Sequence, residues 1–274
     1  MNYIIYNDDL IAENNFIINP SNRAFCYGDG LFETLILKNG KLLFLEDHIN
    51  RLSEGLQLLD IELPKIVSAE ALLEKTILLA HKNNLSSNAR VKLQVWRKEG
   101  GLVTPESTDA NYTITVSELK KPIEVKKDAY VSENIKLHFG NLSKFKTLNF
   151  LPYIQAGIEK KKRNVDEIIL TDSKGNISEA SSSNIFWVKS DCLFTPSLEA
   201  GCIDGIMRKQ IIKFCKQESI KITIGLFPAS ELINSELLFT SNVNGLSIIE
   251  NVNNSKINTQ YTIYQAIRIS MDLI

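Results

Sequence analysis

The sequence predicts an α+β chain of two domains. Apolar and polar residues alternate through much of the N-terminal third, as they do in half-buried β-strands, while other stretches carry apolar residues at helical spacing. Between residues 119 and 122 a polar stretch ends in a proline, which interrupts both patterns and is typical of a linker. We therefore expect one domain over residues 1–118, a linker over 119–123 and a second, larger domain over 124–274.

The N-terminal part predicts a β-hairpin followed by two helices and two strands. The turn Lys38-Asn39-Gly40 separates two strand-like runs, and Asn-Gly is a dipeptide that two-residue hairpin turns prefer. Apolar residues at helical spacing follow, and Ser68 stands where a helix N-cap is expected. The elements expected here are strands over 31–37 and 41–45, a helix through about residue 59, a helix over 69–81, and strands over 89–97 and 112–116.

The second part of the chain shifts to short strands with a few helices. The basic run Lys160–Arg163 follows Leu151, Ile154 and Ile158 at helical spacing, which indicates the last turn of a helix, where cations favour the dipole. The other elements expected here are strands over 167–171, 176–180, 185–188, 192–195 and 236–239, and helices over 204–217 and 261–273.

Composition excludes several functional classes. The chain has 31 basic and 32 acidic residues, so no electrostatic feature favours nucleic acid as a partner. Its four cysteines lack metal-ligand spacing and no signal peptide opens the sequence, so we expect reduced thiols, a cytoplasmic location and no metal site. No apolar run is long enough to cross a bilayer. The partner that remains is a small-molecule substrate.

Three features between residues 146 and 208 predict the chemistry. Lys146 stands among apolar residues, a setting that desolvates an amine and suits Schiff-base formation. Glu179 supplies a carboxylate that can hold a pyridinium proton. The helix expected after Asp204-Gly205 offers backbone N–H groups to a phosphate. These are the requirements of a pyridoxal 5′-phosphate site, which makes that cofactor the expected one.

Four separated blocks of sequence support this interpretation by their order along the chain. They are Arg23–Thr34, His48–Leu52, the stretch from Asp166 to Phe186 with Ser178-Glu179, and Thr195-Pro196 with Gly205–Arg208. In this order they resemble class IV aminotransferases, the fold type IV pyridoxal phosphate enzymes. That family includes branched-chain and D-amino acid aminotransferases and aminodeoxychorismate lyase. The resemblance implies a small N-terminal α/β domain, a larger C-terminal domain with a barrel-like sheet, the cofactor between them, and a homodimer.

The resemblance also assigns roles to single residues. Lys146 is expected to bind the cofactor and act as the catalytic base, Glu179 to pair with the pyridine nitrogen, and Arg51 to bind the phosphate. Further cofactor donors expected are the backbone N–H groups of Ile206 and Met207 and the groups of Thr240 and Ser241. The residues expected along the substrate pocket are Phe25, Tyr27, Phe32 and Arg97, and Arg208 is expected to form a structural ion pair.

Local departures from the family branches bear on the reaction. The Arg-x-His pair of D-amino acid aminotransferases is replaced by Leu102-Val103-Thr104, and the Tyr-x-Arg of branched-chain enzymes by Arg90-Val91-Lys92. Aminodeoxychorismate lyases are similar at Lys146–Asn149, Gly205–Arg208 and Arg97–Gly101, although Leu102 stands where a further basic residue suits a dianionic substrate. The resemblance therefore favours the lyase, which releases pyruvate and leaves 4-aminobenzoate for folate synthesis. The alternatives are a branched-chain or D-amino acid aminotransferase and, more remotely, a non-catalytic binding protein of the same fold.

Overall fold

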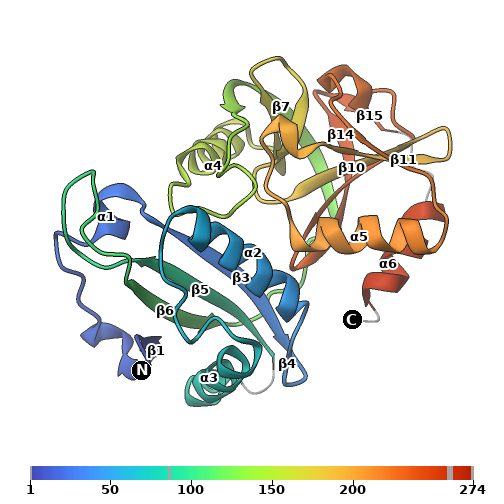
Figure 1. Ribbon diagram of the computed structural model, residues 1–274. Coiled ribbons are helices and arrows are strands. Elements are labelled where there is room, and N and C mark those ends of the chain that lie inside the picture. The colour runs from blue at the N-terminus through green and yellow to red at the C-terminus, as the bar shows by residue number, and fades with distance from the viewer. Residues whose placement is uncertain (1, 86–87, 258–261, 273–274) are drawn as a thin grey trace. The chain divides into compact units, whose positions relative to one another are not determined.

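The chain folds into two compact units, each with its own β-sheet (Figure 1). The computed structural model describes residues 2–85, 88–257 and 262–272. The first unit contains Met1–Lys120 together with Phe145–Asn149, and the second contains Lys121–Lys144 together with Phe150–Ile274. The expected α+β fold with two domains is confirmed. The segment Phe145–Asn149, which carries Lys146, lies with the first unit although it follows the predicted linker.

The first unit is an antiparallel sheet with helices packed on it. Its described residues form six strands in the order β2-β1-β6-β5-β3-β4. The strands are β1 (Tyr3–Tyr6), β2 (Asp9–Ala12), β3 (Gly30–Lys38), β4 (Lys41–Leu42), β5 (Ala89–Arg97) and β6 (Ala110–Ser117), and the helices are α1 (Arg23–Tyr27), α2 (Leu45–Leu58) and α3 (Ala69–Lys82). Alternate strand residues such as Leu35 and Val91 form the core with Leu56 and Leu79 from the helices. This is the period of two that the sequence shows.

The predicted hairpin and helix cap of this unit are confirmed. Asn39 and Gly40 have φ angles of 51° and 75°, the left-handed values that a type I′ turn requires. Strand β4 ends at Leu42 instead of the predicted residue 45, because Phe44 takes a left-handed φ of 52° that leads the chain into α2. Ser68 caps α3, since its Oγ accepts a hydrogen bond from the Ala71 N–H at 3.3 Å.

The second unit is a mixed sheet that curls on itself. Its described residues form nine strands, in the order β12-β11-β10-β13-β14-β7-β8-β9 with β15 beside β14. They are β7 (Val125–Leu137), β8 (Glu167–Asp172), β9 (Ile177–Ala180), β10 (Asn184–Lys189), β11 (Cys192–Pro196), β12 (Ile222–Gly225), β13 (Leu237–Asn242), β14 (Gly245–Val252) and β15 (Ser255–Lys256). The end strand β9 meets the start of β10 through a bridge between Ala180 and Ser183. This contact gives the sheet its barrel-like form.

Among the described residues, three α-helices complete the second unit. They are α4 (Leu151–Arg163), α5 (Ile206–Gln217) and α6 (Thr262–Asp272); the predicted ends of the last helix, Tyr261 and Leu273, lie outside the described residues. Helix α4 packs on β7 and β8 (Figure 1), and its basic last turn is confirmed. Its buried residue is Ala156, whereas the periodic residues Leu151, Ile154 and Ile158 are 63%, 54% and 50% exposed. The spacing of the apolar residues therefore predicted the helix correctly, but it did not predict which face of the helix is buried.

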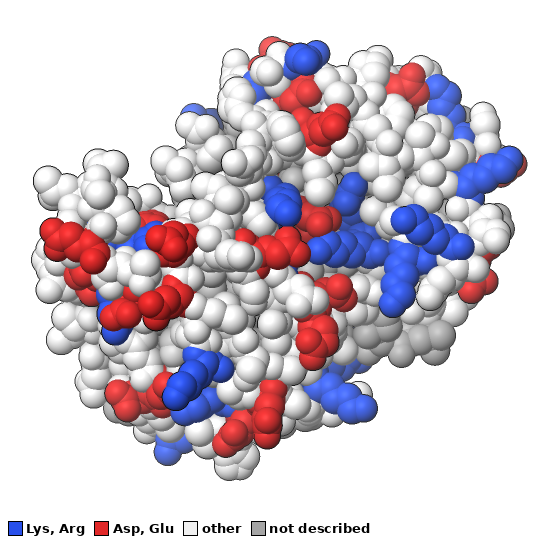
Figure 2. All heavy atoms as spheres, in the orientation of Figure 1, with Lys and Arg blue, Asp and Glu red and all other residues white. Residues whose placement is uncertain are grey.

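On the face in Figure 2, acidic and basic side chains both lie over the first unit, while basic ones gather over α5, which carries Lys209, Lys213 and Lys216. Lys209 pairs with Asp204 at 3.2 Å. No helix within residues 2–85, 88–257 and 262–272 has the length and apolar character needed to span a membrane.

Replacing glycine with alanine should change the free energy of unfolding in opposite directions at two helical positions. A Cβ at Gly55 in α2 would lie 2.5 Å from Leu31 Cδ1 and 3.1 Å from the Phe145 ring, so Gly55→Ala should lower the free energy of unfolding by about 1–3 kcal/mol. At Gly157 in α4 a Cβ meets nothing within 4 Å, so Gly157→Ala should raise it by up to about 1 kcal/mol. Urea unfolding measures both, and equal effects would contradict the close packing at Gly55.

Candidate active site

Backbone hydrogen bonds hold Lys146 against the start of β3. The Phe32 N–H donates to the Lys146 carbonyl at 2.8 Å, and the Leu148 N–H donates to the Gly30 carbonyl at 2.9 Å. Leu31 and Thr147 form a β-bridge between these two bonds. The segment therefore extends the sheet of the first unit by a short antiparallel pairing, which positions the lysine from its main chain.

The Lys146 amine lies over an aromatic ring that it shares with a second lysine. Lys146 Nζ is 4.5 Å from the centre of the Phe32 ring, and Lys92 Nζ is 5.1 Å from the same centre. Lys92 is half-buried on β5, and burial together with the charge of Arg90 lowers the pKa of its amine. Two amines and an aromatic ring are therefore brought together on the face of the sheet opposite the core.

Lys92 is a residue whose role the sequence analysis missed. The sequence pattern that could have indicated it is the alternation along β5, where Val91 and Leu93 are buried and Lys92 between them is not. Because Thr34 pairs with Lys92 across the strands, Lys92 and Phe32 lie on one face. The pairing of β3 with β5, which joins residues about sixty positions apart, was needed to place them together.

A buried carboxylate positions Arg51. Glu33 Oε1 accepts from Arg51 Nε at 2.7 Å, Glu33 Oε2 accepts from Arg51 Nη2 at 2.5 Å, and His48 Nδ1 lies 2.7 Å from Oε2. Burial alone would raise the pKa of Glu33, but the charge of Arg51 and the hydrogen bond from His48 lower it to about 2. Arg51 thus belongs to an ion pair within the first unit, and its contact with a phosphate remains a prediction.

In the second unit, Glu179 accepts hydrogen bonds from α4, from β10 and from the turn before α5. Its Oε1 accepts from the Tyr153 hydroxyl at 2.5 Å and from the Ile203 N–H at 3.0 Å, and its Oε2 accepts from Asn184 Nδ2 at 3.1 Å. Glu179 is 3% exposed. Burial and the Glu179 charge raise the pKa of the neighbouring Cys202 thiol to about 12, which keeps that thiol neutral. Several donors on a buried carboxylate stabilise its charged form.

The N-terminus of α5 lies beside this carboxylate. A Cβ on Gly205 would collide with Asn184 Oδ1, so only glycine allows the two segments to approach. Asn184 also donates to the Ile203 carbonyl at 2.8 Å, which joins the start of β10 to the turn before α5. Ile206 and Met207 open the helix with the N–H groups that an α-helix leaves without an internal partner. These two N–H groups are therefore placed to bind an anion.

Arg208 has the structural role that the sequence predicted. Its Nη1 lies 3.3 Å from Asp204 Oδ1, and its Nη2 donates to the Pro196 carbonyl at 2.9 Å. The side chain is buried. Arg208 therefore links the first turn of α5 to the end of β11.

Thr240 and Ser241, two further predicted cofactor residues, differ in their surroundings. Thr240 Oγ1 accepts from the buried Lys126 Nζ at 2.9 Å, and the same amine donates to Glu167 at 2.6 Å. The Ser241 hydroxyl is buried and has no hydrogen-bond partner among the described residues. A buried hydroxyl in that state costs free energy unless a ligand or water satisfies it. The Ser241 hydroxyl and the α5 amides as donors, with the Glu179 carboxylate as an acceptor, are a set of groups that fits a phosphorylated pyridine.

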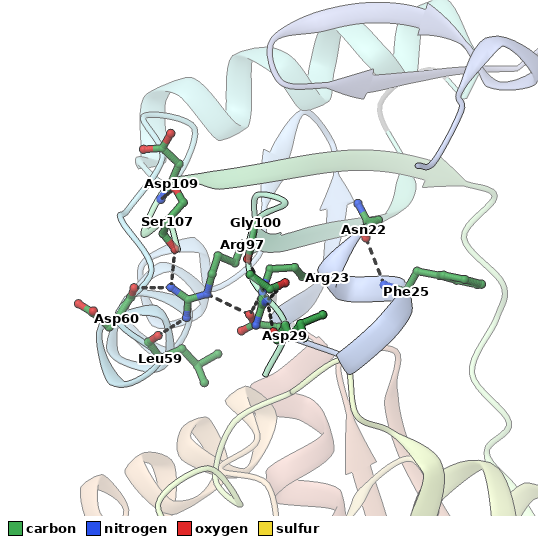
Figure 3. Close-up of polar contacts among 12 residues, drawn as sticks. Asn22, Arg23, Phe25, Asp29, Leu59, Asp60, Arg97, Gly100, Ser107 and Asp109 are labelled. Atoms are coloured by element: carbon green, nitrogen blue, oxygen red, sulfur yellow. Dashed lines mark hydrogen bonds and ion pairs between the residues drawn. The ribbon is translucent and has the colours of Figure 1, made fainter. Parts of the chain in front are cut away.

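Of the four predicted substrate residues, Phe32 has a described contact with Lys146. Phe25 and Tyr27 are 74% and 44% exposed on α1. Arg97 is buried, and Figure 3 shows its guanidinium between Asp29 and the carbonyls of Leu59 and Asp60. These bonds give Arg97 a structural role, and its contact with a substrate carboxylate stays a prediction.

Comparison with known proteins gives consistent results. Residues 30–252 match the model of the family described as amino-transferase class IV. The chain is 28% identical over 245 residues to the aminodeoxychorismate lyase of Bacillus subtilis, covering 87% of this chain and 82% of that protein. It is 26% identical to the D-alanine aminotransferase of Listeria innocua, over 87% and 83% of the two chains. The branched-chain amino acid aminotransferase of Escherichia coli has the same fold, with a TM-score of 0.90, 21% identity and coverage of 99% and 94%.

The Glu33 ion pair should make stability depend on acid pH. The folded pKa of about 2 lies below the ordinary 4.5, so the pair contributes fully above about pH 4.5 and its contribution is lost as pH falls towards 2. The loss should reach about 2 kcal/mol at pH 3 and approach about 3 kcal/mol below pH 2. Urea unfolding between pH 7 and pH 3 measures it; Glu33→Gln should be destabilised at pH 7 and show a flatter pH dependence. Glu70→Gln, at an exposed glutamate of α3, is the control and should follow the wild type.

Proposed function

The chain belongs to the amino-transferase class IV family, and from this membership we propose that it is an aminodeoxychorismate lyase. The family consists of enzymes that use pyridoxal 5′-phosphate, and its lyases and aminotransferases share most of their binding residues. The proposed reaction removes pyruvate from aminodeoxychorismate and leaves 4-aminobenzoate. The difference between lyase and aminotransferase activity must therefore come from other groups near the reacting amine. These groups bind the rest of the substrate.

The observation that supports the lyase is the second amine beside Lys146. Aminodeoxychorismate carries two carboxylates, and a site for it needs cationic donors besides the catalytic lysine. Leu102 supplies no such charge, but Lys92 places its amine over the same Phe32 ring as Lys146. A substrate carboxylate there would favour the charged form of Lys92, against the burial that lowers the pKa of its amine.

The residues of this chain have separate tasks in the proposed reaction. The bound cofactor supplies an electron sink for the carbon that carries the amino group. The Lys146 amine would take the proton from that carbon. The bond between the ring and the enolpyruvyl oxygen would then break, the ring would become aromatic, and the departing enol would gain a proton and leave as pyruvate. Glu179 would accept a hydrogen bond from the pyridine nitrogen.

Phosphate binding is assigned to the residues that the sequence resemblance implied for it. We propose that Arg51 and the N–H groups of Ile206 and Met207 hold the phosphate, with Ser241 as a further donor. The unsatisfied buried hydroxyl of Ser241 supports its role. Thr240 contributes through its backbone in this proposal, because its hydroxyl accepts from Lys126 and donates to the Ser247 carbonyl. Glu33 holds Arg51 in one orientation, which lowers the entropy lost when a phosphate binds.

An aminotransferase is the alternative, favoured by the similarity to D-alanine aminotransferase. It would use the same lysine and carboxylate but return the amino group to a keto acid. A non-catalytic binding protein is a remoter alternative, since it would have no need of the amine at Lys146. The cofactor's visible absorbance and the need for a keto acid distinguish the three.

We also propose a homodimer that works in the cytoplasm. The exposed apolar residues Leu151, Ile154 and Ile158 form a stripe on α4, which supports burial against a second subunit. Four free cysteines suit a reducing compartment. Sedimentation of the purified protein measures its oligomeric state.

Lys146→Ala should abolish the visible absorbance of the lysine-bound cofactor while leaving the fold intact. The wild type should release pyruvate from aminodeoxychorismate without an added keto acid, and the variant should release none. Absorbance spectra, coupled pyruvate detection and circular dichroism measure these effects. A band in the variant that borohydride still fixes to the protein would place the cofactor on another lysine.

Lys92→Met should raise the KM for aminodeoxychorismate at least about tenfold, because a charge-assisted contact with a carboxylate is lost. The visible band should persist, since Lys146 is unchanged. Lys41→Met, at an exposed lysine of β4, is the matched control and should keep the wild-type KM. An unchanged KM in the Lys92 variant, or turnover that requires a keto acid, would argue against the lyase.

A further inference from the structure

Tyr153 contacts Glu179 at the start of α4, and neither the resemblance nor the proposed reaction assigns it a role. Its hydroxyl donates to Glu179 Oε1 at 2.5 Å, the shortest of the three bonds described for that carboxylate. The donor lies 26 positions before its acceptor, on a helix that packs against β8. Sequence offers no signal for it, because an aromatic residue in a first helical turn usually indicates packing alone.

The phenol is held in a fixed orientation. The rings of Phe150 and Tyr153 stack with centroids 4.1 Å apart and an interplanar angle of 20°. Such stacking restricts the rotation of the Tyr153 side chain, so its hydroxyl is already directed at the carboxylate before any ligand binds. The bond to Glu179 is thus part of the resting structure.

Tyr153 is suited to donate a proton in a hydrogen bond but not to lose it. Burial and the charge of Glu179 raise the pKa of the phenol well above its usual value. The hydroxyl therefore stays protonated at any pH at which the protein works, and it stabilises the ionised form of Glu179. A hydrogen bond to a charged group contributes more than one between neutral groups.

We propose that Tyr153 is a positioning residue for cofactor binding, which acts through Glu179 by keeping that carboxylate ionised and fixed in orientation. The inference rests on the proposed role of Glu179 as partner of the pyridine nitrogen. It differs from that role in naming a residue that touches the carboxylate and not the cofactor. Its consequence is that the Tyr153 hydroxyl matters only while Glu179 is a carboxylate.

A double-mutant cycle on the full-length protein tests this dependence. The variants are Tyr153→Phe, Glu179→Gln and both together, prepared without cofactor and titrated with pyridoxal 5′-phosphate. Tyr153→Phe should weaken the affinity about five- to tenfold when Glu179 is present and less than about twofold when Gln replaces it. The visible absorbance maximum of the bound cofactor, which responds to the state of the pyridine nitrogen, should shift in Tyr153→Phe as well.

The second unit supplies a matched control. The Tyr130 hydroxyl donates to Glu133 Oε1 at 2.8 Å, which is the same pair of groups at an exposed position. Tyr130→Phe should change neither the affinity nor the spectrum. Thermal unfolding of the cofactor-free variants shows whether either substitution disturbs the fold, and a loss of affinity that accompanies general unfolding would count against the inference.

The remaining outcomes separate the inference from the proposed function. If Glu179→Gln leaves affinity and spectrum unchanged, Glu179 is not the partner of the pyridine nitrogen, and both proposals fail. If Glu179→Gln weakens binding while Tyr153→Phe has no effect, or has the same effect in both backgrounds, the role of Glu179 stands and that of Tyr153 is overturned.

Discussion

The pairing of β3 with the segment 146–148 is the constraint on which the placement of Lys146 depends. Three residues near the start of this strand have separate tasks. Gly30 and Phe32 hold the main chain around Lys146, the Phe32 ring lies beneath two amines, and Glu33 on the other face binds Arg51 and His48. Because strand side chains alternate between faces, a single strand can position a nucleophile on one side and a cation on the other.

Each unit contains a buried carboxylate that is held by several hydrogen bonds. Glu33 and Glu179 are almost inaccessible to solvent, and each would be destabilising if it lacked partners. Glu33 is satisfied by Arg51 and His48, while the hydrogen bonds described for Glu179 come from Tyr153, Asn184 and the Ile203 N–H. Glu33 thus fixes an arginine in place, whereas donors from three segments of the second unit fix the orientation of Glu179.

The proposed choice between lyase and aminotransferase depends on what surrounds the lysine, since the lysine itself serves both reactions. Lys92 adds a second amine beside Lys146, over the same Phe32 ring. Glu167 and Lys126 form another buried pair, which contacts Thr240 and the turn at Ser181 behind the Glu179 strand. The chemistry thus uses few residues, but their placement depends on networks that extend across the sheet.

The sequence by itself determined the two-domain α+β fold, the Asn39-Gly40 hairpin, the Ser68 cap and the family, because turn, cap and motif signals depend on residues close together in the chain. It also identified Lys146 and Glu179 as candidates. Only the tertiary structure decided that Leu151, Ile154 and Ile158 are exposed, that Arg97 is buried, that Lys92 lies over the Phe32 ring, and that Tyr153 contacts Glu179. Those facts depend on contacts between residues tens of positions apart, and no local pattern encodes which distant partner a side chain will meet.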